Sequence, residues 1–111
     1  MEQGLAIVLT TVSSDKEAES LSDILVKSKY VACINILPDI KSKYMWKGEL
    51  QNTKELILMI KTRKDYFKYL EEIIKNYHPY QIPEILLIDI TDVSTDYKTW
   101  IIKNLEMTLD K

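Results

Sequence analysis

Apolar positions along the chain follow two periods, one typical of strands and one typical of helices. Leu5 to Val12 is a short aliphatic and β-branched run, which predicts a buried strand. The segment from Ser14 to Glu17 fits a capping box, and apolar residues then recur at helical spacing over residues 15 to 29. The chain is therefore expected to open with a strand and an amphipathic helix.

A long hairpin is predicted next. Residues 30 to 37 alternate between two faces, Pro38 indicates a bulge or bend, and the alternation resumes over residues 40 to 46. Residues 47 to 49 contain a glycine that can take up a positive φ, which is typical of a turn. The return strand is expected over residues 50 to 62, with one apolar face made of Leu56, Leu58 and Ile60.

The second half of the chain predicts two helices and one strand. A helix is expected over residues 64 to 77, a two-proline loop over 78 to 84, a strand over 85 to 90 and a third helix over 95 to 105. The inner stripe of the first of these helices is expected to be Phe67, Leu70, Ile74 and Tyr77. The order β-α-β-β-α-β plus a terminal helix predicts an α+β, ferredoxin-like fold with an antiparallel sheet, as a single domain over residues 1–111.

The two middle strands are longer than their neighbours. With roughly 13 to 17 residues each at ~3.3 Å per residue, the hairpin should span ~45 Å beside strands of ~25 Å. Its projecting end carries Tyr44, Met45 and Trp46. Because a bare ribbon is marginal in water and exposed aromatic edges invite pairing, this extended hairpin favours an oligomer built by strand addition. The alternative is that the third helix folds back over the ribbon.

Composition narrows the class of protein. Fifteen Lys and Arg against 17 Asp and Glu give a net charge of −2, which argues against a nucleic-acid binder. No apolar run approaches the length of a membrane span, so we expect no membrane partner. No secretory signal is visible at the N-terminus either. Cys33 is the only cysteine, which predicts a reduced, cytoplasmic chain.

Several chemistries common on ferredoxin-like folds lack their residues here. The sequence has no C-x-x-C pair, no phosphate-binding glycine loop, and no aromatic residue in the return strand for stacking RNA bases. No pairing of nucleophile and base is evident, so we do not expect an enzyme. His78, the only histidine, is either a metal ligand or general base, or a residue that only ends a helix. Cys33 is a less favoured metal ligand, because strand cysteines are usually small core residues.

Four motifs occur in a distinctive order. They are A-C-I-N-I at residues 32–36, S-K-Y-M-W-K-G at 42–48, H-P-Y-Q-I-P-E at 78–84 and D-Y-x-x-W at 96–100. Because of these four motifs, residues 7 to 105 resemble the CutA-type divalent-cation tolerance family. The resemblance implies a homotrimer joined by inter-subunit strand pairing and a link to copper tolerance, with copper bound by some members. It also implies a likeness to PII-type signalling trimers, hence small-ligand sensing.

The motif residues supply the candidate site. We expect His78, Tyr80 and Glu84 to lie close to Lys61, with aromatic residues of the ribbon nearby or contributed by an adjacent subunit. Such a cleft, lined by a carboxylate, an amine and aromatic walls, suits a small charged ligand. Alternatively, Lys61 and Glu84 form an ion pair that only locks the interface. The expected ligand-binding residues are Lys61, Tyr80, Glu84, Tyr44, Trp46 and Glu55, with His78 as candidate metal ligand.

The chain departs from the family at two positions that bear on copper. Some bacterial members have a Cys near the end of the first strand and two consecutive His before the P-Y pair, where this chain has Thr10 and Tyr77-His78. Copper sites need several N or S donors, and one of those three is retained here. We expect a trimeric protein that binds copper, another divalent cation or a small ligand, or that signals in response to one of them. A structural trimeric scaffold, or an enzyme with a site near His78, Glu84 and Lys61, stays open.

Overall fold

The computed structural model describes the backbone of residues 4–109 and the side chains of residues 4–106. Four strands and three helices follow the predicted order, with one short 3₁₀ turn, η1, before the second helix. The elements are β1 (Leu5–Val12), α1 (Asp15–Val26), β2 (Cys33–Trp46), β3 (Glu49–Arg63), η1 (Lys64–Tyr66), α2 (Phe67–Tyr77), β4 (Leu86–Asp89) and α3 (Thr95–Leu109).

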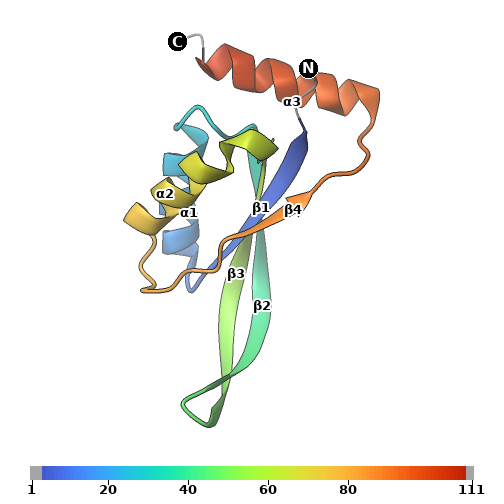
Figure 1. Cartoon of the computed structure of the whole chain (residues 1–111). Helices are drawn as coiled ribbons and strands as arrows, with labels where there is room; N and C mark the ends of the chain where they lie inside the picture. Colours follow the sequence, from blue (N-terminus) through green and yellow to red (C-terminus); the bar gives the residue numbers. More distant parts are fainter. Residues whose placement is uncertain (1–3, 110–111) are drawn as a thin grey trace.

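The strands form one antiparallel sheet in the order β2-β3-β1-β4. Helices α1 and α2 lie side by side on one face of this sheet, and α3 lies across its end (Figure 1). The predicted α+β class and the antiparallel sheet are therefore confirmed. None of the helices in the described part of the chain is long and apolar enough to cross a membrane.

The main core lies between the sheet and the two covering helices. Because strand side chains alternate, β1 and β3 send every second residue toward the helices, and Val8, Leu58 and Ile60 are fully buried there. Leu25 of α1 and Leu70 of α2 close this layer from the other side. A second cluster fixes α3 against the end of the sheet, through Leu5, Ala32, Tyr66, Ile101 and Leu105.

The hairpin projects beyond the sheet, as its length predicts. β2 and β3 contain 14 and 15 residues, whereas β1 contains 8 and β4 contains 4. The pairing of β1 with β3 ends at Val12 and Leu56, so the hairpin continues from there as a bare ribbon (Figure 1). A β-bulge interrupts the pairing of β2 between Leu37 and Ile40, which confirms the irregularity expected at Pro38.

The tip of the ribbon is a two-residue turn. Lys47 and Gly48 have φ values of 52° and 80°, and two positive φ angles are what a type I′ hairpin turn requires. The alternative in which the third helix covers the ribbon is wrong, because α3 lies at the opposite end of the molecule (Figure 1).

Three local predictions need correction. α1 ends at Val26 and not at residue 29, because the chain reverses there and Lys29 adopts a φ of 86° that no helix contains. The strand expected from residue 30 consequently begins at Cys33. Tyr77 is 60% exposed and not part of the inner stripe, because α2 ends at this residue; the residue after it, His78, is buried.

Candidate functional site

Glu55 stands at the base of the ribbon. It pairs with Ile40 directly after the bulge and lies one residue beyond Leu56, where β3 loses its β1 neighbour. Its side chain is half-buried. A carboxylate is thereby held at the junction between the compact sheet and the projecting ribbon.

Tyr80, from that loop, contacts the carboxylate directly. The Tyr80 hydroxyl donates a hydrogen bond to Oε2 of Glu55 at 2.8 Å. Burial, and then the hydrogen bond to Glu55, raise the pKa of Tyr80 well above the ordinary value of 10.0. The phenol therefore stays protonated at neutral pH and remains a donor to Glu55.

Glu84 brings a second carboxylate to the same place. Partial burial, and then repulsion by the Glu55 carboxylate, raise the pKa of Glu84 above its ordinary value of 4.5. Its side chain stays largely open to solvent, which limits the rise. Glu55, Tyr80 and Glu84, called the Glu55 cluster below, thus form an acidic site that a cation would stabilise.

His78 lies behind the cluster and ties the loop to the sheet. It is the C-cap residue of α2 and is only 8% exposed. Its Nε2 lies 2.6 Å from the backbone oxygen of Thr11, and its Nδ1 accepts a hydrogen bond from the Tyr80 N–H at 3.0 Å. These contacts fit a neutral ring with its proton on Nε2. Both ring nitrogens are engaged, so a metal ion would have to displace one of these bonds.

The start of α1 supports the cluster from another side. The predicted cap is present, because Ser14 Oγ accepts a hydrogen bond from the Glu17 N–H at 3.2 Å. The Glu17 carboxylate reaches back to Ser13, accepting from its N–H at 2.9 Å and from its hydroxyl at 2.7 Å, and not to Ser14 as a strict capping box would. This fixes Ser13 beside the Tyr80 phenol.

A shallow depression of about 110 Å³ borders Glu55. One wall is the β2 bulge, where Asp39 has a φ of 60°, and the other is the beginning of α1. Apart from Glu55, none of the lining residues was among the predicted site residues, although the irregularity expected at Pro38 lies here. The lining residues are Ser13, Asp15, Pro38, Asp39, Lys54, Glu55 and Leu56.

Lys61 does not join the Glu55 cluster within one chain. It lies six residues along β3 from Glu55, which is about 20 Å of extended strand. Its Nζ donates a hydrogen bond to the Tyr97 hydroxyl at 3.2 Å and lies 5.4 Å from the centre of that ring. The expectation that Lys61 lies beside Glu84 in one chain is therefore wrong, because the two-proline loop reaches the sheet at its ribbon end and Lys61 lies toward the other end.

The remaining candidates lie apart as well. Tyr44 and Trp46 stand on the bare ribbon, 46% and 56% exposed, and Cys33 is a half-buried free thiol opposite Lys61 on β3. Across residues 4–106, no three side chains of His, Cys, Asp or Glu converge closely enough to hold a metal ion. A single chain therefore assembles only part of the predicted site.

Comparison with known proteins decides the family. A family model described as CutA1 divalent ion tolerance protein matches residues 6–104. The chain belongs to the CutA1 family. The divalent-cation tolerance protein CutA of Thermus thermophilus is 38% identical over 98 residues, covering 88% of this chain and 95% of the relative. The protein of the same name from Pyrococcus horikoshii is 38% identical over 99 residues, covering 89% and 96%.

Solved structures of CutA1 proteins share the fold. The protein from Ehrlichia chaffeensis superimposes with a TM-score of 0.88 at 30% identity, covering 95% of this chain and 98% of the other. The protein from Thermus thermophilus gives a TM-score of 0.85 at 37% identity, covering 90% and 97%. The predicted family is confirmed, and with it a general link to divalent-cation tolerance.

The two departures from the CutA1 pattern have clear structural settings. Thr10 is fully buried on the helix-covered face of the sheet, and its hydroxyl has no hydrogen-bond partner among the described residues. Tyr77 points to solvent. Neither residue offers a nitrogen or thiolate donor near His78. Neither the contact of His78 with the Thr11 backbone nor that of Lys61 with Tyr97 was predicted, although Tyr97 belongs to one of the four motifs.

Proposed function

We propose that this CutA1-family chain functions as a homotrimeric binding protein in divalent-cation tolerance and is not an enzyme. Its ligand is copper, another divalent cation or a small charged molecule, taken up at the Glu55 cluster. The observation that carries the proposal is that cluster itself: Tyr80 orients one carboxylate, and a second carboxylate with a raised pKa stands beside it.

The incomplete site favours completion by a neighbouring subunit. Within one chain the amine of Lys61 and the aromatic rings of Tyr44 and Trp46 lie far from the Glu55 cluster, as described above. Strand pairing between subunits along the ribbon would bring a second chain to the base where Glu55 lies. The predicted contact of Lys61, Tyr44 or Trp46 with the Glu55 cluster is therefore proposed as an inter-subunit contact.

The open face of the sheet supports self-association. Leu86 and Ile88 are 52% and 47% exposed, and Ile7, Leu9 and Met59 on the same face are only partly covered. A contiguous apolar sheet surface in water is typical of an interface, because its burial removes apolar area from solvent. We propose a second and third copy of this chain as the cover, which agrees with the trimer that the family resemblance implies.

The donor set favours oxygen-binding cations. The two carboxylates offer oxygen ligands, which suit hard divalent ions, whereas copper also needs N or S donors. His78 would add a nitrogen donor only after giving up its bond to Thr11 or Tyr80. A cytoplasmic location completes the proposal, supported by the single cysteine. An enzyme that uses Lys61 with Glu84 receives no support from one chain, because these residues are apart.

Titration calorimetry with Cu(II) and with other divalent ions tests the proposal. Glu55→Gln and Glu84→Gln should each weaken binding at least about tenfold, or about 1.4 kcal/mol. Glu72→Gln, the same change on the exposed surface of α2, is the matched control and should bind like the wild type. His78→Ala reports whether the imidazole contributes a donor. Equal binding by wild type, Glu55→Gln and Glu84→Gln, or no binding of any ion by the wild type, would sink the proposed cation site.

A further inference from the structure

A cluster of three tyrosines lies away from the Glu55 cluster, at the corner where the lead into β2 meets the start of α2. The rings of Tyr30 and Tyr69 stack face to face, with centroids 4.4 Å apart and an interplanar angle of 2°. Tyr66 meets Tyr30 edge-on at 5.2 Å and Tyr69 edge-on at 6.3 Å. The stacked pair joins two segments that are separated by the whole hairpin in sequence.

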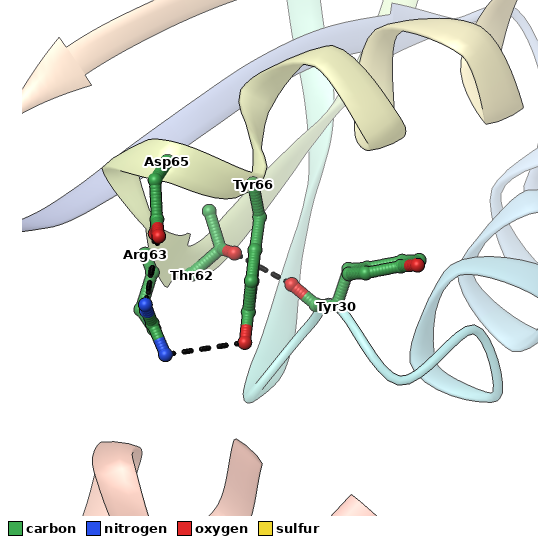
Figure 2. Close-up of polar contacts among 5 residues, drawn as sticks. All are labelled: Tyr30, Thr62, Arg63, Asp65 and Tyr66. Atoms are coloured by element: carbon green, nitrogen blue, oxygen red, sulfur yellow. Dashed lines mark hydrogen bonds and ion pairs between the residues drawn. The ribbon is translucent and has the colours of Figure 1, made fainter. Parts of the chain in front are cut away.

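The backbone beneath this stack is fixed. Thr62 Oγ1 donates a hydrogen bond to the carbonyl of Tyr30 at 2.5 Å (Figure 2), and the Tyr30 N–H donates to Ser28 Oγ at 3.3 Å. Tyr69 projects from α2, whose Leu70 is fully buried in the core. Both rings are therefore held in contact by elements that cannot easily separate. Two groups fixed in contact in this way have a high effective concentration for any reaction between them.

The three phenol hydroxyls differ in their hydrogen bonding. The Tyr66 hydroxyl is bound by Arg63 at 3.2 Å, and the same guanidinium holds Asp65 through two bonds (Figure 2). Tyr66 is also buried, at 8% exposure, whereas Tyr69 is 50% exposed. Within residues 4–106 no hydrogen bond engages the hydroxyl of Tyr30 or Tyr69. Tyr69 is thus accessible, Tyr30 is partly buried against the core, and neither phenol is committed to a hydrogen bond.

Two stacked phenols are placed for oxidative coupling. Removal of one electron and one proton from each ring gives two phenoxyl radicals, and a carbon–carbon bond then forms between their ortho positions. The proton on each joined carbon moves to its phenolic oxygen, which restores both aromatic rings. The two electrons and two protons released reduce one hydrogen peroxide to two waters, so the reaction is balanced with a peroxide as oxidant.

We propose that Tyr30 and Tyr69 form an intramolecular dityrosine when the protein meets peroxide and a one-electron catalyst such as a peroxidase or a redox-active metal ion. The bond turns a stacking contact into a covalent link between the β2 lead and α2. This link constrains the unfolded chain in the way that a disulfide does. The modified protein should consequently resist denaturation more than the unmodified protein.

Treatment of the full-length protein with hydrogen peroxide and a peroxidase tests this assignment. We expect dityrosine fluorescence, and a digest in which the peptides containing Tyr30 and Tyr69 are joined with the loss of two hydrogens. Tyr30→Phe and Tyr69→Phe retain the ring but lack the phenol, so each should lower this product at least tenfold. Tyr66→Phe and Tyr77→Phe should leave it unchanged, the latter as an exposed control.

Three results would overturn the proposal: no dityrosine in the wild type, coupling confined to other tyrosines or to pairs of chains, or an undiminished yield in Tyr69→Phe. Circular dichroism of each variant before oxidation shows whether the fold is retained. If one phenylalanine variant fails to fold, the peptide map of the oxidised wild type still decides which two rings are joined.

Discussion

Both faces of the sheet carry apolar side chains, but the two faces have opposite surroundings. On the face covered by α1 and α2, Val8, Leu58 and Ile60 are completely buried. On the other face, Leu86 and Ile88 are about half exposed, at 52% and 47%. The difference indicates that the helices of one chain cover only one face of the sheet. The covered face should therefore govern folding of the protomer, and the open face should govern association.

A charge on the open face should have the largest effect. Ile88→Asp would bury a carboxylate in the proposed interface, where desolvation costs several kcal/mol, and the assembly should dissociate. Multi-angle light scattering measures the resulting mass. Val26→Asp is the matched control, since Val26 is 44% exposed on the helix side, and it should keep the wild-type mass. A wild-type mass for Ile88→Asp would mean that the open face is not the interface.

A cavity on the covered face should act on the protomer itself. Leu58→Ala removes a side chain that is 0% exposed, which should lower the free energy of unfolding by about 2–5 kcal/mol. Urea unfolding measures this loss. Ile57→Ala, the neighbouring position on the open face, should instead lower the midpoint mainly at low protein concentration, where the weakened assembly dissociates. If both variants lose the same stability at every concentration, the two faces do not divide folding from association.

Loss of the His78 ring should have an intermediate effect on one end of the sheet. His78→Ala leaves the Thr11 carbonyl and the Tyr80 N–H without their present partners, which should cost about 1–3 kcal/mol of stability. Amide hydrogen exchange should then be faster in residues 78 to 84 than in α1. Unchanged exchange in that loop would show that His78 does not fix it.

The smallest expected effect is the pH dependence set by Tyr80. Its pKa is raised on folding, so its contribution to stability is present below the ordinary value of 10.0 and is lost as the pH rises above it. Tyr80→Phe should cost about 1 kcal/mol at neutral pH and should flatten the loss of stability between about pH 10 and 12. Tyr77→Phe, at an exposed position, should keep the wild-type profile. Equal profiles for Tyr80→Phe and wild type would remove Tyr80 as the source of this pH dependence.

The fold was largely predictable because its signals are local. Each signal acts over a few residues, and the structure confirms it: the aliphatic run of β1, the alternation in β3, the helical spacing of Leu21 and Leu25, and the bulge at Pro38. The helix ends were less predictable. The chain reversal at Lys29 and the exposure of Tyr77 depend on the path of the chain after each helix. The spacing of apolar residues does not encode that path.

The site was predictable as a set of residues but not as an arrangement. The sequence placed Glu55, Tyr80 and Glu84 among the candidates, and the structure brings these three together. It placed Lys61 there as well, whereas the register of β3 carries Lys61 toward α3 and Tyr97. Register and loop path are long-range properties, since a shift of a few residues moves a side chain from one end of a strand to the other.

Sedimentation equilibrium of the wild-type chain at micromolar concentration tests most directly whether the open face is covered by further copies. We expect one species with about three times the chain mass of 13.0 kDa, because three copies would cover the apolar surface that a single chain leaves in water. A monomer of 13.0 kDa throughout the micromolar range would contradict the homotrimer. It would also contradict the claim that the covered face governs folding and the open face governs association.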